Sequence, residues 1–161
     1  MAPKSDAQSH AKPDAALKRL DRLVGTWAMR GRPAGAKQDS ITGTTTFQWL
    51  AGGFFLEQDM TMDYAGKAIV SRELIGFDPK SGAFASFVYS NMAPDPWPYR
   101  WDIQSDSITI AIQKPPMDAT FTGKFAADGK SWSGGWRPNP GADETVNTTY
   151  DVTCTLVSRP A

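Results

Sequence analysis

Histidine and cysteine are almost missing from this chain of 161 residues, which holds one histidine, His10, and one cysteine, Cys154. A single cysteine excludes an internal disulfide bond. Zinc sites need three or four protein ligands, mostly Cys and His, so no such metal site can be assembled. Histidine-ligated haem and Ser-His-Asp or Cys-His catalysis are disfavoured too, because His10 lies in a polar N-terminal segment. We therefore expect no metal and no cofactor.

An excess of charge is missing as well: 17 Lys and Arg balance 17 Asp and Glu. Nucleic acids and anionic membranes bind basic patches, so neither is an expected partner. No run approaches the ~20 apolar residues of a membrane span. Residues 1–13 also lack the apolar segment of a signal peptide. We expect a cytoplasmic protein in which residues 1–13 form a disordered tail.

Aromatic residues, in contrast, are plentiful, with six Trp, eight Phe and four Tyr. Such side chains carry large apolar areas and collect in cores, pockets and interfaces. Near the start, Asp14 is a suitable N-cap, apolar residues follow at helical spacing, and Gly25 ends the pattern. The apolar residues are Leu17, Leu20, Leu23 and Val24. We expect a short helix over 14–24 that covers one end of a larger structure, because so short a helix is marginal alone.

From Trp27 onward the hydrophobic period is two, which is typical of strands. We expect strands near residues 26–32, 41–50, 53–64, 67–78, 82–91, 99–105, 107–114, 117–127, 130–136 and 145–157. Many short strands joined by short turns predict an all-β sandwich or closed barrel. No linker interrupts the pattern, so residues 14–161 are expected to form one domain.

The turn at Ala65-Gly66 sets the register of one hairpin, because a two-residue loop places Tyr64 opposite Lys67. Counting back along the hairpin then fixes which residues share a face. The pairs on the inner face are Met62 with Ile69, Met60 with Ser71, Gln58 with Glu73, Leu56 with Ile75, and Phe54 with Phe77. This face is mostly apolar.

Two further turns predict apolar faces of the same kind. A turn at Asp106-Ser107 would pair Ile103 with Ile110 and Trp101 with Ile112; one at Asp128-Gly129 would pair Phe125 with Trp132 and Phe121 with Trp136. Closing the sheet puts all these faces inside and leaves no unpaired edge. We therefore expect a single antiparallel up-and-down β-barrel of about 8–10 strands with a short N-terminal helix.

Two segments carry a resemblance to a known family. Leu23-Val24-Gly25-Thr26-Trp27 resembles the G-x-W start of lipocalin-like barrels, and residues 46–58 (TFQWLAGGFFLEQ) together with Gly76-Phe77-Asp78 are more specific. With these residues the chain resembles a bacterial family of lipocalin-like domains of unknown function, the 1579-type family, best over residues 17–90. The resemblance implies a calycin-type barrel with a ligand cavity and no established activity. It also implies that Arg159 stacks on Trp27. A haem-binding relative holds its haem through a histidine, and this chain has no histidine beyond its N-terminal tail.

Gln58 and Glu73 form a polar pair on the otherwise apolar inner face. Binding pockets are mostly apolar with a few placed polar groups, so the pair is a candidate anchor for the polar end of a ligand. Desolvation would raise the pKa of Glu73 and suit it to act as a general base. The alternative is a purely structural pair, hydrogen-bonded to each other, to water or to a nearby Arg.

The proline-rich segment 94–101 joins two strands and carries Trp97 and Tyr99. It is either a rim or lid that presents these rings to a cavity mouth, or a loop that covers one barrel end. Arg137 follows Trp136 at a strand end, where it is a candidate partner for an acidic group of a ligand.

Three functions fit these observations. The first is binding of a small hydrophobic or aromatic molecule in a lumen lined by Phe54, Leu56, Met60, Met62, Ile75, Trp101, Phe121 and Trp136. The second is a cofactor-free isomerase, lyase or cyclase with Glu73 and Tyr150 as catalytic candidates. The third is a barrel filled by its own side chains and used for protein interaction, including a homodimer.

Overall fold

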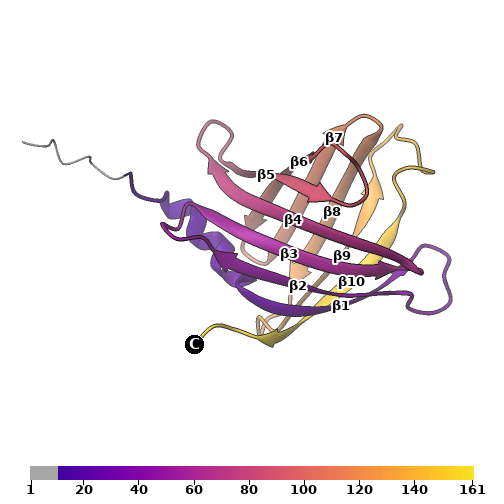
Figure 1. The fold of residues 1–161 in the computed structure, drawn as a ribbon, viewed down its shortest axis with the longest axis horizontal. Coiled ribbons are helices and arrows are strands. Elements are labelled where there is room, and N and C mark those ends of the chain that lie inside the picture. Colours follow the sequence, from indigo (N-terminus) through magenta and orange to yellow (C-terminus); the bar gives the residue numbers. More distant parts are fainter. Residues whose placement is uncertain (1–10) are drawn as a thin grey trace, which may run out of the picture.

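The computed structural model describes residues 11–161 and shows a closed barrel of ten antiparallel strands with one short helix (Figure 1). The elements are η1 (Ala15–Leu23), β1 (Gly25–Pro33), β2 (Ile41–Trp49), β3 (Phe55–Tyr64), β4 (Lys67–Asp78), β5 (Ala83–Ser90), β6 (Trp97–Gln104), β7 (Ser107–Lys114), β8 (Met117–Phe125), β9 (Ser131–Pro138) and β10 (Tyr150–Ser158). Each strand pairs with its neighbours in sequence, and β1 pairs with β10. The predicted up-and-down barrel is confirmed. Residues 1–10 of the predicted tail, including His10, lie outside the described residues.

Helix η1 covers one end of the barrel, as its leucine spacing predicts (Figure 1). It is a 3₁₀ helix, in which every third residue faces the same way. This period buries Leu17, Leu20 and Leu23 against the barrel. The side chain of Asp14 caps the helix by accepting the Ala16 N–H at 2.8 Å.

The hairpin of β3 and β4 has the register that its turn predicts. Ala65 and Gly66 both have positive φ, at 50° and 91°, as a tight hairpin turn requires. Gln58 therefore lies opposite Glu73, and the outward Asp59 bonds Arg72 at 2.7 Å. The predicted pair of Phe54 with Phe77 is wrong. Strand β3 begins at Phe55, so Phe54 lies in the preceding turn, where it is 37% exposed.

The turn between β6 and β7 corrects a second expectation. Ser105 has a positive φ of 49°, so the loop is Ser105-Asp106 and the register differs by two residues from the predicted one. Trp101 pairs with Ile110, and Ile103 with Ile108. The faces stay as predicted, because a shift of two residues leaves each side chain on its own side of the sheet. Contacts from elsewhere hold this turn, since Asp106 bonds Arg22 of η1 at 2.9 Å.

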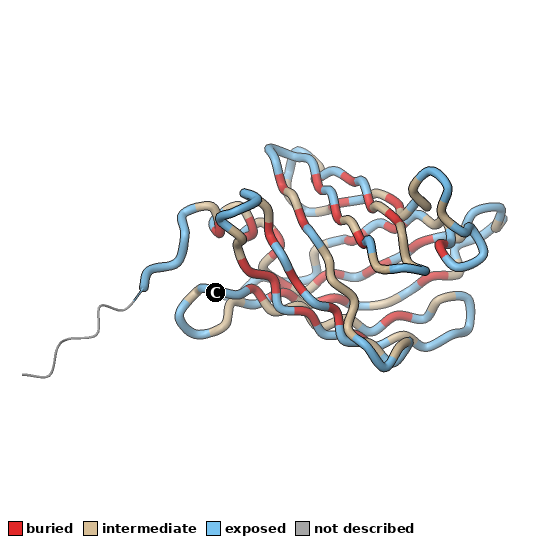
Figure 2. Tube along the Cα trace, turned by 90° about the horizontal axis from the view of Figure 1, so that it is seen from above, coloured by how far each residue is buried: buried red, intermediate tan, exposed pale blue. Residues whose placement is uncertain are grey.

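The half of the barrel next to η1 is a packed aromatic and aliphatic core. Trp132 makes edge contacts with Trp27 and Phe121, with ring centroids 6.3 and 6.1 Å apart. The indole N–H of Trp27 donates to the Leu23 carbonyl at 2.7 Å, which ties the barrel floor to the helix. The guanidinium of Arg159 lies 5.6 Å from the Trp27 ring, as the family resemblance implies. Figure 2 shows buried and exposed positions alternating along the strands that enclose this core.

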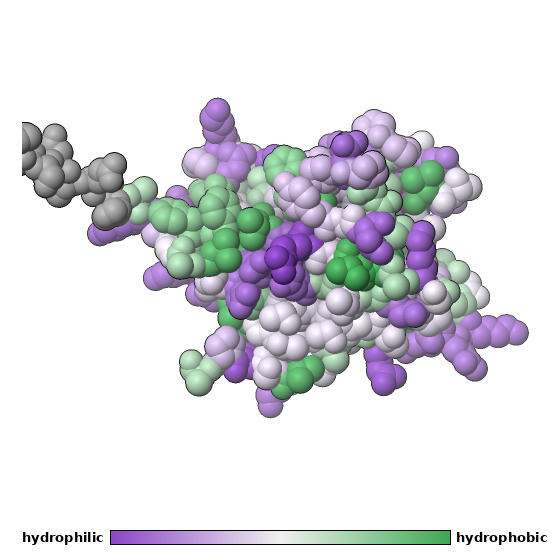
Figure 3. All heavy atoms as spheres, in the orientation of Figure 1, coloured by the Kyte–Doolittle hydropathy of each residue, from purple (hydrophilic) through white to green (hydrophobic). Residues whose placement is uncertain are grey.

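The outer surface mixes ion pairs with apolar side chains. On the face seen in Figure 3, hydrophobic patches flank a strongly hydrophilic cluster. The exposed apolar residues on β4 and β5 are Val70, Leu74, Phe87 and Tyr89. Within residues 11–161 no helix is long and apolar enough to cross a membrane.

Candidate functional site

The barrel lumen has two unlike halves. Next to η1 most inward side chains are buried, as Trp27, Phe47 and Phe121 show, while Trp49, Phe77 and Leu156 at that end are partly buried. In the half away from η1, several inward side chains keep part of their surface exposed. These are Gln58, Met60, Tyr64, Ile69, Tyr99, Trp136 and Tyr150, on β3, β4, β6, β9 and β10. Strand alternation points these side chains of the mouth half inward in a closed sheet, where the apolar and aromatic ones pack against the core with part of their surface exposed.

Glu73 is the carboxyl group of this lumen. It lies on β4, is 2% exposed, and follows the inward alternation that also buries Ile75. Its Oε1 accepts two hydrogen bonds, one from the Ser86 hydroxyl and one from the indole N–H of Trp101 at 2.7 Å. Burial raises the pKa of Glu73 to about 7, and the two hydrogen bonds oppose this rise only in part. The sequence predicts a raised pKa for Glu73 because this residue lies on a mostly apolar inner face, and the structure shows the same direction.

Gln58 lies opposite Glu73 in the β3–β4 register but bonds elsewhere. Its amide Nε2 donates to Oγ1 of Thr45 on β2 at 2.9 Å. The expected alternative of a Gln58–Glu73 pair bonded to each other is therefore not formed. The two polar groups are held by separate partners, Gln58 by Thr45 and Glu73 by Ser86 and Trp101.

Tyrosine and tryptophan rings line the mouth half of the lumen. Tyr64 and Tyr150 meet edge to face with centroids 5.2 Å apart, and Tyr99 lies 5.5 Å from Trp136. Burial raises the pKa of Tyr99 well above its usual value, and the nearby Tyr150 and Glu73 raise it further. Burial likewise raises the pKa of the Tyr150 hydroxyl. Both phenols therefore stay protonated near neutral pH and act as hydrogen-bond donors rather than bases.

The other predicted site residues divide between the core, the rim and the surface. The core contains Leu56, Ile75, Trp101 and Phe121, and Met62 is 8% exposed. Trp97 begins β6 at the rim and is partly exposed. Phe54, placed in the lumen from the sequence, lies instead in the turn before β3. Arg137 is exposed and bonds Asp151 at 2.7 Å, and its contact with a ligand at the rim stays a prediction.

Sequence reasoning missed three residues of the site: Thr45, Tyr64 and Ser86. Ser86 lies between Phe84 and Val88 on the inward side of β5, and the alternation of that strand could have revealed it. Thr45 is fully buried and holds Gln58. Nothing local distinguishes Thr45, because β2 carries four threonines and only the barrel decides which one faces inward.

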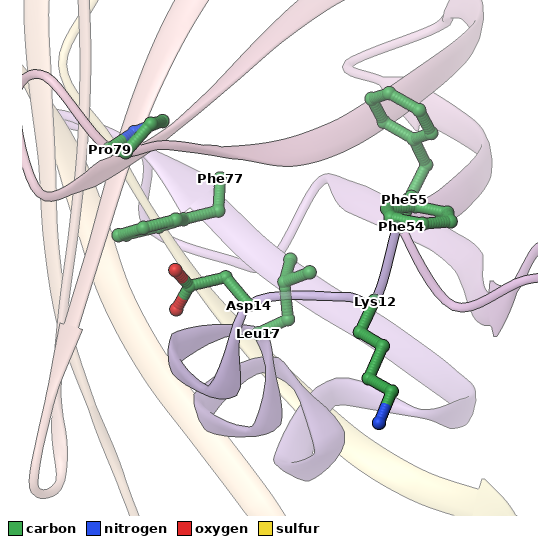
Figure 4. A pocket seen from close by; sticks show the side chains of 7 residues that line it. All are labelled: Lys12, Asp14, Leu17, Phe54, Phe55, Phe77 and Pro79. Atoms are coloured by element: carbon green, nitrogen blue, oxygen red, sulfur yellow. The ribbon is translucent and has the colours of Figure 1, made fainter. Parts of the chain in front are cut away.

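A hollow of about 270 Å³ lies outside the lumen, where η1 begins. Figure 4 shows Phe54 and Phe55 on one side of it and Phe77 and Pro79 on the other. Lys12, Asp14 and Leu17 complete the lining. Its polar members are a surface lysine and the helix cap, so it lacks the buried polar group that marks the lumen. No three His, Cys, Asp or Glu side chains within 11–161 gather closely enough to hold a metal ion.

Comparisons with known proteins give a family for this chain and a solved structure of similar fold. A structure of Rv2717c from M. tuberculosis is similar, with a TM-score of 0.56 and 14% sequence identity over 91% of this chain and 100% of the other. At that identity the likeness concerns the fold alone. No curated protein matches the sequence. The family model described as "Protein of unknown function (DUF1579)" matches residues 12–130, so the chain belongs to that family.

Proposed function

We propose that the protein binds a small, largely apolar or aromatic molecule in the mouth half of its barrel. One observation carries this proposal: partly exposed aromatic and methionine side chains face inward around the buried carboxyl of Glu73. Apolar walls with a few placed polar groups are the usual composition of a small-molecule site. Met60 adds adaptability, because its unbranched side chain can take several shapes against a ligand.

A barrel that is filled throughout, the third function considered from the sequence, is supported better in the helix half than at the mouth. There the large rings contact one another and are buried, as Phe47 and Trp101 do with centroids 6.4 Å apart. In the mouth half Ile41 and Ile112 are equally buried, whereas Met60 and Trp136 keep part of their surface exposed. This contrast supports a lumen that is packed at the floor and accessible at the mouth.

A titration with N-phenyl-1-naphthylamine, a neutral apolar dye that fluoresces in dry surroundings, tests the proposal. We expect micromolar binding together with a change in tryptophan emission, because Trp136 lines the proposed site. Met60→Trp should fill the space and abolish binding. Val70→Trp adds the same ring to the outer face of β4 and is the matched control. If Met60→Trp binds the dye as wild type does, the dye sits elsewhere and the lumen proposal fails.

A cofactor-free isomerase, lyase or cyclase is the second candidate function. It is favoured by the pKa of Glu73, about 7, which suits a general base at neutral pH. Tyr150, the other candidate from the sequence, would serve only as a donor because burial raises its pKa. If such an activity exists, Glu73→Gln should abolish turnover while substrate affinity changes only a few-fold. If only affinity changes, the protein is a binder.

A further inference from the structure

The charge that faces the lumen has one sign. Along the inward positions of the ten described strands, the interior carries a single carboxyl group, that of Glu73, and no arginine. Two lysines follow the inward alternation, Lys67 and Lys114, but each is the terminal residue of its strand at the rim. Lys114 donates to the Pro96 carbonyl at 3.0 Å. A ligand in the mouth half thus meets a carboxyl and no deep positive charge.

The carboxyl of Glu73 has a free side. Both of its donors, Ser86 and Trp101, bond the same oxygen, Oε1. Within residues 11–161 no group donates a hydrogen bond to Oε2. Among the described residues only Nε1 of Trp132 is fully buried without a hydrogen-bond partner, so Oε2 of Glu73 keeps some accessible surface. A positively charged ligand group that reached this oxygen would compensate its charge best.

Aromatic faces surround the approach to this carboxyl. Tyr99 precedes Trp101 by two residues on β6 and so lies on the same inward face, in contact with Trp136. The contacting pair of Tyr64 and Tyr150 adds two further rings. A cation within about 6 Å of a Trp or Tyr ring is attracted to the ring face, more strongly once water is excluded. Aromatic rings around a carboxylate are the elements from which proteins build sites for substituted ammonium groups.

We propose, resting on the lumen-binding function above, that the natural ligand is an organic cation: an amine or quaternary ammonium group on an apolar or aromatic body. The cationic group would lie between Oε2 of Glu73 and the rings of Tyr99, Trp136 and Tyr150. A fatty acid or other anion is the opposite case, because it would face the carboxylate without a counter-charge. A neutral ligand would pair with Oε2 only if it carried an O–H or N–H donor, and it would leave the negative charge uncompensated.

Proton linkage gives this proposal a signature. A permanent cation binds the ionised form of Glu73, so its affinity should rise with pH up to about 7, the pKa of the free carboxyl, and level off above it. Between pH 5 and pH 8 the ionised fraction of such a group grows by about a hundredfold. The other titratable groups on the inward positions are Tyr64, Tyr99, Tyr150 and Cys154, with the two lysines at the rim. Tyr99 and Tyr150 stay neutral over this range because their pKa is raised.

Displacement of N-phenyl-1-naphthylamine by two ligands of one shape tests the proposal. Benzyltrimethylammonium carries a permanent charge, and 2,2-dimethylpropylbenzene has carbon in place of its nitrogen. At pH 8 the cation should displace the dye at least tenfold more effectively than the hydrocarbon. Its affinity should fall by about a hundredfold at pH 5 while that of the hydrocarbon stays constant. Glu73→Gln should remove both the preference and the pH dependence, whereas Glu144→Gln, an exposed surface control, should keep them.

The outcomes separate this inference from the function on which it rests. If the hydrocarbon binds as tightly as the cation at pH 8, the lumen binds apolar molecules and the cation proposal is overturned alone. If neither the dye nor either ligand binds, lumen binding itself is overturned. Should Glu73→Gln fold poorly, Tyr150→Leu supplies a second variant. It should weaken the cation several-fold more than the hydrocarbon, and an equal loss for both would contradict the proposal.

Discussion

The buried carboxyl of Glu73 should make the stability of the barrel depend on pH in an unusual direction. Its pKa rises from 4.5 to about 7 on folding, mainly because it loses water. Between these values the folded chain keeps a proton that the unfolded chain has lost, so the free energy of unfolding falls as pH rises. The stabilisation that Glu73 contributes is complete below pH 4.5 and is lost as the pH rises through about 7. The difference corresponds to about 3 kcal/mol.

Glu73→Gln isolates this effect. Glutamine keeps the shape and the oxygen that accepts from Ser86 and Trp101, but it cannot ionise. We expect the variant to gain about 2–3 kcal/mol over wild type between pH 5 and pH 8, or about 5–10 °C in Tm. Urea unfolding at pH 5, 6, 7 and 8 measures this gain. Glu144→Gln should follow the wild-type profile as a surface control. A difference between Glu73→Gln and wild type that does not change with pH would refute the claim that the carboxyl is desolvated.

Three more perturbations test other parts of the structure. Leu20→Ala, at a fully buried site of η1, should lower the free energy of unfolding by about 2–5 kcal/mol in urea titrations. A loss below about 0.5 kcal/mol would show that the helix is not part of the core. Trp101→Phe removes a hydrogen bond that favours the ionised form of Glu73, so the pKa of Glu73 should move above 7. NMR titration of the Glu73 carboxyl measures this pKa, and a downward move would contradict the assigned bond. Asn147 is buried and donates to the carbonyls of Pro116 and Asp143, so Asn147→Ala should cost about 1–3 kcal/mol and speed amide exchange at the rim, whereas unchanged exchange would mean that the loop is held otherwise.

The strands and the β3–β4 register follow from the sequence because the information is local. Period-two alternation marks each strand, and Ala65-Gly66 allows one tight turn. That turn alone sets Gln58 opposite Glu73, although each of them lies seven residues from the turn. The register of β6 and β7 is harder to predict from the sequence, because Asp106 in the turn between them bonds Arg22, a residue of the helix. A contact between segments so far apart in sequence leaves no mark on the turn residues themselves.

The candidate site was predictable only in part, for a related reason. The alternation that put Glu73 inside the barrel says nothing about its partners on β5 and β6, Ser86 and Trp101. Arg137 follows the inward Trp136, and alternation could have assigned it to the outer face, where Asp151 on β10 binds it. The predicted pairing of Phe54 with Phe77 is wrong because β3 and β4 stop pairing at Phe55, where the preceding turn ends. Pairing in the plane of the sheet can thus be counted, whereas packing across the lumen cannot.

A crystal structure of the protein with bound N-phenyl-1-naphthylamine tests the central claim most directly, that the mouth half of the barrel is a binding site. We expect electron density for the dye between Met60, Tyr99 and Trp136, with the core beside η1 unchanged. Density for the dye in the hollow beside Phe54 and Phe77, with none in the lumen, would contradict the account.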